Sequence, residues 1–192
     1  MAEKEIDPTL VTVGQPVEGG ACFVSFDESP VLPTDATTAL DASFVSVGEI
    51  STNGYTESKS VTSTDHKGWH GSILLTTIDE ETNTFKTEFL EVNRAAAAKL
   101  RYGAGNVEVD ATTGEVKHIT GKPGQIKPVA LVFEELESNG YKRRTVFRRS
   151  MVSSFDDVAH QKGQLMLYGM TFTASEVDGN PFDVFRAKPV EA

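Results

Sequence analysis

Residues 84–90 read TFKTEFL, and their alternation decides the fold. Phe85, Thr87 and Phe89 alternate with Lys86 and Glu88, which is the period of a β-strand that buries one face. Eight further segments are similarly short, rich in Val, Ile, Thr and Phe, and separated by turn sequences such as STNG and DGNP. The predicted strands are residues 21–26, 43–50, 71–78, 84–90, 107–110, 116–119, 129–136, 141–147 and 165–174.

The sequence that follows this strand, NRAAAAKLRYG, is the one convincing helix signal in the chain. Asn93 can act as the N-cap, the alanines have the highest intrinsic helix propensity, and Gly103 can supply a left-handed stop. A helix of about ten residues is marginally stable alone, so it must pack on a sheet. We therefore predict a helix near residues 93–102 with Ala96, Ala97 and Leu100 facing that sheet.

About nine strands and one helix predict a mainly β protein, either a β-sandwich or a barrel. The chain has 192 residues, which is enough for a single domain with a substantial core. We assign residues 21–192 to that domain and residues 1–20 to an N-terminal arm. Two other long connections remain, residues 27–42 and the polar stretch 56–70. Compact domains rarely carry several long loops, so we expect these segments to become ordered against a partner.

The charge distribution argues against nucleic-acid binding. The net charge is −10, and residues 1–58 hold ten acids against Lys4, which gives 1 − 10 = −9 for that segment. A protein that binds DNA or RNA needs a basic surface to displace counterions from the phosphates. The sequence also offers no apolar run long enough for a bilayer and no signal-peptide pattern at its start. Cys22 is the single cysteine and lies in an apolar stretch, which indicates a buried thiol.

The stretch TDHKGWHGS at residues 64–72 is the strongest candidate for chemistry, and we interpret it as structural. His66 and His70 have the spacing of a metalloprotease helix, but two glycines disfavour a helix and Lys67 stands where that motif needs Glu. No nucleophile motif or phosphate-binding loop occurs elsewhere. We therefore predict no catalytic residue, no metal and no cofactor. Trp69 is expected to pin a glycine-jointed loop against its own or a neighbouring subunit.

The basic cluster KRRTVFRR at residues 142–149 has two interpretations. A nucleic-acid contact would use five bases in eight residues, but strand alternation divides these bases between two faces. Pairing with the acidic N-terminal third of a neighbouring subunit explains both charge features, and we favour it.

Residues 13–58 contain VGQPVEGGACFVSF, LPTDATTALDASF and VSVGEISTNGYTES in this order. This run resembles the N-terminal part of the major tail tube proteins of long-tailed, non-contractile bacteriophages (siphophages). The resemblance continues through TDHKGWHGSILLTT and FLEVNRAAAAKLRYG and fades after about residue 140. It is most specific at LPTDATTALDASF. The sequence departs from the family pattern at His70 and Glu49, where Gly and Tyr are usual.

The resemblance implies a structural virion protein, made in the host cytoplasm, that forms stacked hexameric rings. These rings would build a hollow tube around a tape measure protein and later conduct the genome. The implied partners are further copies of the chain, the tape measure protein, the tail terminator and tail tip proteins, and double-stranded DNA that passes without specific binding; no membrane is involved.

An acidic lumen would keep DNA from adhering to the wall, because attractive walls would hold its phosphates. The candidate lumen residues are Glu57, Asp65, Asp79, Glu80, Glu81 and Glu88. The candidate subunit-interface residues are Trp69, Arg94, Arg143, Arg144, Arg148 and Arg149.

Two alternative functions, each of a different class from a structural virion protein, remain open. A receptor- or carbohydrate-binding β-sandwich of a tail tip or adhesin would present a cluster of exposed aromatic side chains. A small hydrolase built on DHKGWH would present a bound metal and a concave pocket.

Overall fold

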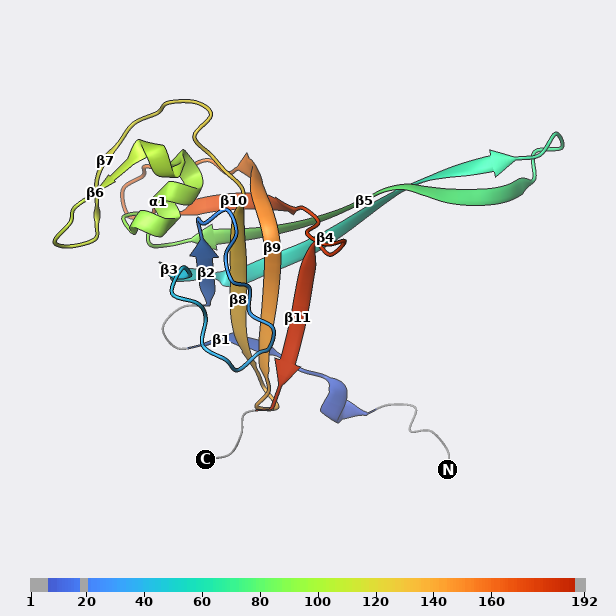
Figure 1. Cartoon of the computed structure of the whole chain (residues 1–192), viewed down its shortest axis with the longest axis horizontal. Coiled ribbons are helices and arrows are strands. Elements are labelled where there is room, and N and C mark those ends of the chain that lie inside the picture. The colour runs from blue at the N-terminus through green and yellow to red at the C-terminus, as the bar shows by residue number, and fades with distance from the viewer. Residues whose placement is uncertain (1–6, 18–20, 189–192) are drawn as a thin grey trace.

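The computed structural model describes residues 7–17 and 21–188 and confirms a mainly β fold with one α-helix in these residues (Figure 1). Nine strands form a large antiparallel sheet, and two short strands form a separate small one. The strands of the large sheet are β1 (Gly14–Pro16), β2 (Cys22–Ser25), β3 (Val45–Gly48), β4 (Ile50–Lys67), β5 (Ile73–Phe89), β8 (Val129–Glu137), β9 (Lys142–Phe155), β10 (Tyr168–Ala174) and β11 (Phe182–Ala187). The small sheet contains β6 (Val107–Val109) and β7 (Val116–Ile119), and two short 3₁₀ turns cover Pro8–Leu10 and Ala104–Asn106.

The large sheet folds over on itself at strand β9. Its path runs β3-β2-β8-β9-β10-β5-β4, with β1 on β8 and β11 on β9 as branches. The first half of β9 pairs with β8 and β11, because Arg144 lies opposite both Glu134 and Phe185. The second half pairs with β10, where Ser154 lies opposite Thr171. Since β10 leads on to β5 and β4, two layers face each other across the core, as expected for a sandwich.

Aromatic side chains from both layers meet at Phe85 of β5. The Phe85 ring stacks on Phe147 of β9 at a centroid distance of 3.8 Å and on Phe172 of β10 at 4.8 Å. It meets Phe133 of β8 edge-on at 5.7 Å. Aromatic pairs of this kind stabilise a fold beyond the area they bury. Phe85 and Phe89 are 1% and 0% exposed, so the alternation of TFKTEFL predicts their burial correctly.

The opposite face of the β2–β8–β9 layer is covered by the segment of residues 27–42. Leu32 and Leu40 pack on a second apolar cluster that contains Phe44 and Val132. The expectation that this segment becomes ordered only against a partner is therefore wrong, because it already packs on its own sheet.

Helix α1 (Ala95–Tyr102) lies against β3, β9 and β10 and buries Ala96, Ala97 and Leu100, as predicted. Its N-cap is one residue later than predicted: the N-cap position is Arg94, with no side-chain cap hydrogen bond, rather than Asn93. Gly103 ends the helix with a φ of +87°, a backbone conformation that favours glycine.

Several strand boundaries differ from the prediction. Strands β1 and β11 are not among the predicted strands; β1 has only three residues, and β11 is the last strand of the chain's described part. Residues 165–167 lie outside β10. The STNG sequence at residues 51–54 is not a turn between strands; it is a bulge within β4, where the pairing register shifts between Ile50 and Tyr55.

Candidate assembly surface

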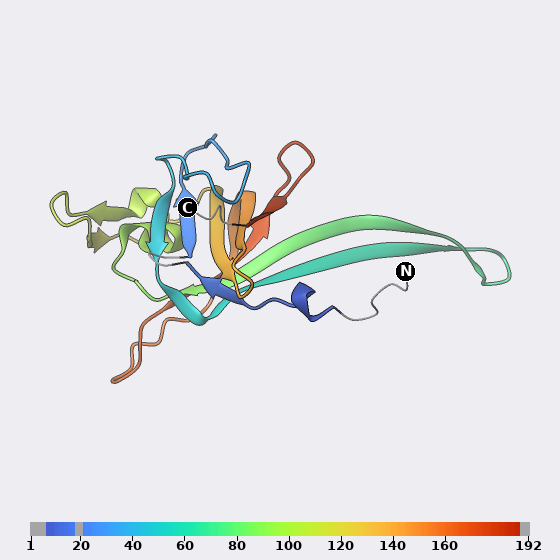
Figure 2. The same cartoon turned by 90° about the horizontal axis from the view of Figure 1, so that it is seen from below.

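Strands β4 and β5 form a long hairpin that projects from the body of the molecule (Figures 1 and 2). We call residues 55–87 the hairpin arm. Pairing is continuous from Tyr55–Thr87 to Lys67–Ile73, apart from two register shifts. The predictions of a polar loop at 56–70 and of two separate strands after it are therefore wrong. Threonine has high β propensity, but the arm carries polar residues on both faces and so lacks the alternation that marks a half-buried strand.

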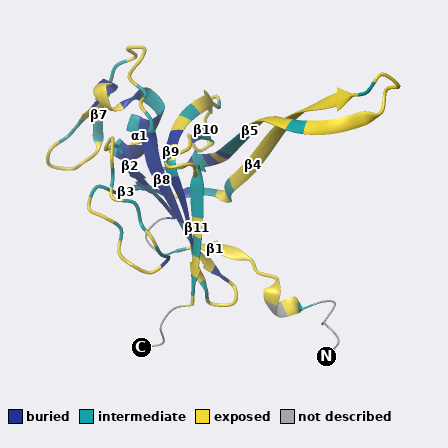
Figure 3. Ribbon diagram, turned by 45° about the vertical axis from the view of Figure 1, so that its right-hand side comes forward, coloured by how far each residue is buried: buried dark blue, intermediate teal, exposed yellow. Residues whose placement is uncertain are grey.

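Most side chains of the hairpin arm are exposed, as the yellow strands of Figure 3 show. Side-chain hydrogen bonds across the two strands partly replace the stabilisation that burial would give. The Thr76 hydroxyl donates to Asp65 at 2.7 Å, and the Thr64 hydroxyl donates to Asp79 at 2.5 Å. Cross-strand pairs of this kind contribute only a few tenths of a kcal/mol to about 1 kcal/mol each, and a lone two-stranded hairpin is marginally stable in water. The arm therefore has much surface left to bury against another molecule.

The end of the arm is a tight turn that presents the tryptophan. The Gly68 amide donates to the Ser72 carbonyl at 2.8 Å, which closes the turn. Trp69 is 100% exposed and Leu74 is 73% exposed. Trp69 thus does not pin the chain against its own subunit, and contact with a neighbouring subunit is the part of that prediction that remains.

The candidate lumen residues fall on two different faces of the β4–β5 hairpin. In the register of the two strands, Glu57 lies opposite Phe85, so it shares the face that continues into the core. By alternation Asp65 and Glu81 share that face, whereas Glu80 and Glu88 lie on the opposite face. Asp79 sits at the register shift beside Glu80 and bonds to Thr64 and Thr77 of the opposite face. Three of the six acids therefore lie on each face.

The opposite face is rich in hydroxyl groups, and we call it the hydroxyl face. It is defined by Thr56, Ser58, Ser60, Thr62 and Thr64 of β4, and by Thr77, Glu80, Thr82, Thr84, Lys86 and Glu88 of β5, together with Asp79 at the register shift.

Glu57 occupies a special position where the hairpin arm meets the body. Partial burial raises the pKa of Glu57, and nearby Glu135 raises it further, while Arg143 lowers it. The Tyr55 hydroxyl donates to Glu135 at 3.3 Å and shares a 3.1 Å hydrogen bond with Thr145. Burial is the main cause of the raised pKa of Tyr55. This polar cluster ties the base of the arm to β8 and β9.

Three of the four arginines in the basic cluster have acid partners in their own chain. Arg144 is 4% exposed, and its guanidinium binds Glu134 and donates to the Asp35 carbonyl at 2.7 Å. The other two pairs are Arg143–Glu135 at 3.6 Å and Arg148–Asp183 at 2.6 Å. Pairing with the acids of a neighbour is thus unnecessary to explain these three side chains. Arg149 is exposed and makes no ion pair within the described residues.

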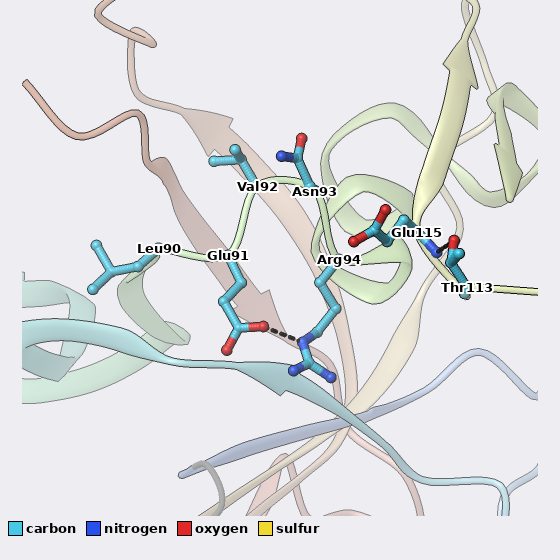
Figure 4. Close-up of a pocket in the computed structure, with 8 residues that line it drawn as sticks. Leu90, Glu91, Val92, Asn93, Arg94, Thr113 and Glu115 are labelled. Atoms are coloured by element: carbon cyan, nitrogen blue, oxygen red, sulfur yellow. Dashed lines mark hydrogen bonds and ion pairs between the residues drawn. The ribbon is translucent and has the colours of Figure 1, made fainter. Parts of the chain in front are cut away.

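Arg94, the remaining interface candidate, lines a hollow of about 440 Å³ between the β5–α1 connection and the turn at residues 113–115 (Figure 4). Its Nε donates to Glu91 at 2.6 Å, and Glu91 also accepts the Glu49 amide at 2.9 Å. The hydrogen bond from Arg94 is the main cause of the lowered pKa of Glu91. Arg94 therefore links the helix entrance to the β3–β4 corner, and its side chain remains 42% exposed.

In residues 7–17 and 21–188, no group of three or more His, Cys, Asp or Glu side chains could hold a metal ion. The histidine pair lies on the hairpin arm and its tip, where the His66 ring bonds to Thr77 at 3.1 Å. Cys22 is fully buried, which raises the pKa of its thiol. No helix in this part of the chain is both long and apolar enough to cross a membrane.

Comparison with known proteins gives one result on the family. A search of curated proteins returned no match. A family model described as "Phage tail tube protein" matches residues 27–187, which is most of the chain and includes the hairpin arm, the helix and the folded-over sheet. A tail tube protein is a structural component of the phage virion that self-assembles into a tube. The match confirms the resemblance seen at LPTDATTALDASF, and the chain belongs to the phage tail tube protein family.

Proposed function

We propose that six copies of this chain form a ring, and that the rings stack into the hollow tail tube of a siphophage, through which the genome passes into the host. The chain is a member of the tail tube family, and the observation that carries this proposal is that its hairpin arm projects away from the folded body. The arm thereby presents exposed, partly apolar surface to other molecules. The tape measure, terminator and tip proteins would be the partners of such a tube. The N-terminal arm would contribute to contacts between subunits; of its residues, 14–16 form β1 on β8.

Electron microscopy of the purified chain at high concentration tests the assembly. We expect hollow tubes or rings. A variant in which Asn-Gly replaces residues 59–83 provides the control, because it joins the paired residues Ser58 and Thr84 by a two-residue turn and keeps Phe85. This variant should fold and stay monomeric. A wild-type chain that remains monomeric at every concentration would contradict the proposal.

We propose further that the hydroxyl face lines the lumen. The other face of the same hairpin continues into the core at Phe85, whereas the hydroxyl face is open to water and carries Asp79, Glu80 and Glu88 against Lys86. A net negative, hydroxyl-rich wall gives DNA little with which to replace its counterions, because the one lysine of this face, Lys86, already pairs with Asp156 at 2.7 Å.

Neighbouring residues offer a matched test of this lining. Glu80 and Glu81 are both exposed but lie on opposite faces. Glu80→Lys should slow DNA ejection from assembled phage, most strongly at low salt, because it places six cations in each ring of the wall. Glu81→Lys makes the same change in charge on the other face, where it also removes the exposed ion pair with Lys59, and should leave ejection unaltered. Equal ejection rates in the two variants would argue against this lining.

The alternative of carbohydrate binding expects a cluster of exposed aromatic rings. In the described residues the exposed aromatic side chains are Trp69 at the end of the arm and Phe155 at the end of β9. These two lie on different elements, so no observation favours that alternative.

A further inference from the structure

The end of the hairpin arm combines positive and apolar groups. We call residues 66–75, HKGWHGSILL, the hairpin tip. It contains Lys67 and two histidines but no acid, although the whole chain carries a net charge of −10. Trp69 and Leu74 are among its most exposed side chains, at 100% and 73%. Exposed apolar groups gathered in one place, with polar residues and Lys67 beside them, indicate a binding surface.

A groove at the other end of the same arm has the complementary character. We call it the base groove; it has a volume of about 500 Å³ and lies between the start of β4, β1 and β8. Its lining includes Ile50, Tyr55 and Phe133, together with the acids Glu49 and Glu135, and no Lys, Arg or His from the described part of the chain. The Glu49 side chain is exposed and has no hydrogen bond or ion pair within the described residues.

We propose that the hairpin tip of one copy docks in the base groove of a second copy. Trp69 would enter the groove and contact Tyr55, whose ring stacks on the buried Phe133, and Lys67 of the tip would lie beside Glu49. This inference rests on the proposed tube function and names the contact that builds the tube. A volume of about 500 Å³ is within the range that accepts drug-sized ligands, so an indole ring fits.

The geometry of the arm excludes docking within a single copy. From Tyr55 to Lys67 the strand covers twelve residue steps, or about 40 Å at 3.3 Å per residue. A continuously paired hairpin cannot bend back over that length, so a tip cannot reach its own base groove. Each copy has one tip and one groove at different places on its surface. A contact of this heterologous kind repeats from copy to copy and builds rings or open stacks.

Charge complementarity favours this occupant over an unrelated protein. The tip brings positive charge to a groove whose charged lining residues, among those described, are both acids. Glu135 already binds Arg143 and Tyr55, whereas Glu49 has no such partner within the described residues. Complementary charges of this kind select the correct partner and fix the register of an interface.

Cysteine crosslinking tests the contact directly. Cys22 is fully buried, so the wild-type chain provides a silent background. Glu49→Cys and His70→Cys subunits are mixed, assembled and treated with a short bis-maleimide. We expect a covalent dimer that contains one subunit of each kind. Lys117→Cys, which is exposed on β7, is the matched control in place of Glu49→Cys, and it should give no such dimer with His70→Cys.

A charge exchange gives an independent readout. Glu49→Lys should raise the protein concentration needed for assembly about tenfold, which corresponds to about 1.4 kcal/mol per contact. Adding Lys67→Glu to Glu49→Lys should bring this concentration most of the way back to the wild-type value. Tubes that form without a crosslink between the Glu49→Cys and His70→Cys subunits would overturn the docking inference and leave the tube function standing. A wild-type chain that forms no tubes or rings would instead overturn the proposed function itself.

Discussion

Replacing Arg144 by Met should destabilise the subunit more than the same replacement at any other arginine of the basic cluster. Arg144 lies in the middle of β9 and is 4% exposed. Its Nε donates to Glu134 at 2.8 Å, and its Nη1 donates to the carbonyl of Asp35 at 2.7 Å. The second bond holds the segment 27–42 on the outer face of the sheet. Methionine keeps the apolar stem of the side chain but removes both interactions.

The expected loss of stability follows from the charge that Arg144→Met leaves unpaired. Removing one partner of a buried ion pair costs about 3–5 kcal/mol, because the other charge stays buried and unpaired. Glu134 has a side chain that is 22% exposed, so water can partly replace the guanidinium. Met also fills much of the vacated volume. The lower end of that range, about 3 kcal/mol, is therefore expected, and it corresponds to a Tm lowered by about 6–12 °C for a domain of this size.

Urea unfolding followed by far-UV circular dichroism measures this loss, because Trp69 is fully exposed and would not report on the core. Arg149→Met is the control: Arg149 lies on the same strand, is exposed and makes no ion pair in the described residues, so its replacement should change stability by less than about 0.5 kcal/mol. Arg144→Met should also speed proteolytic cleavage within residues 27–42. If Arg144→Met were as stable as Arg149→Met, the assignment of Arg144 as a buried anchor would be wrong.

Three further predictions concern the tip, the end of the helix and the response to acid. Trp69 fluorescence should match that of a solvated indole in the monomer and shift to shorter wavelength on assembly; an unchanged spectrum in the tubes would show that the tip stays in water. Gly103→Ala should destabilise the subunit by several kcal/mol, because φ is +87° and the added Cβ would overlap the backbone oxygen of Gln125, whereas Gly114→Ala, at φ +74° with open space around it, should cost about 1–2 kcal/mol in urea unfolding. The hydrogen bond from Arg186 lowers the pKa of Glu137, so this pair stabilises the fold above the unfolded pKa of about 4.3, and the stabilisation is lost as the pH falls through the folded pKa. In Arg186→Met the urea midpoint should therefore depend less on pH between pH 6 and pH 3. A pH profile equal to that of the wild type would contradict this assignment.

The core and the helix could be predicted from sequence because their signals are local. Phe85 and Phe89 alternate with charged residues, and both are buried. The alanine run forms α1, with Ala97 and Leu100 buried against the body. These segments each bury one face against their own chain, which is the condition that produces a readable period.

The hairpin arm could not be predicted because this condition fails there. Within the subunit, residues 56–67 bury neither face, so selection for a core imposes no alternation on them. Their Ser and Thr residues suit a strand as well as a loop. The ion pairs of the basic cluster could not be predicted for a related reason. The partners of Arg144 and Arg148 are Glu134 and Asp183, and only the pairing of β8, β9 and β11 brings these acids near.

The failure of the sequence signal is itself informative about assembly. A strand pair with no core to cover, held by hydrogen bonds of modest strength, has little reason to persist as a long arm in an isolated subunit. In the proposed tube, such an arm would be stabilised when one of its faces packs on a neighbouring subunit while the other face stays in the water of the lumen. The apolar residues Val61, Ile73 and Ile78 lie on the face that continues into the core, and Thr and Ser dominate the other. The first face therefore offers apolar groups, together with Glu57, Asp65 and Glu81, to a neighbouring subunit, whereas the second offers mainly hydroxyl groups to water.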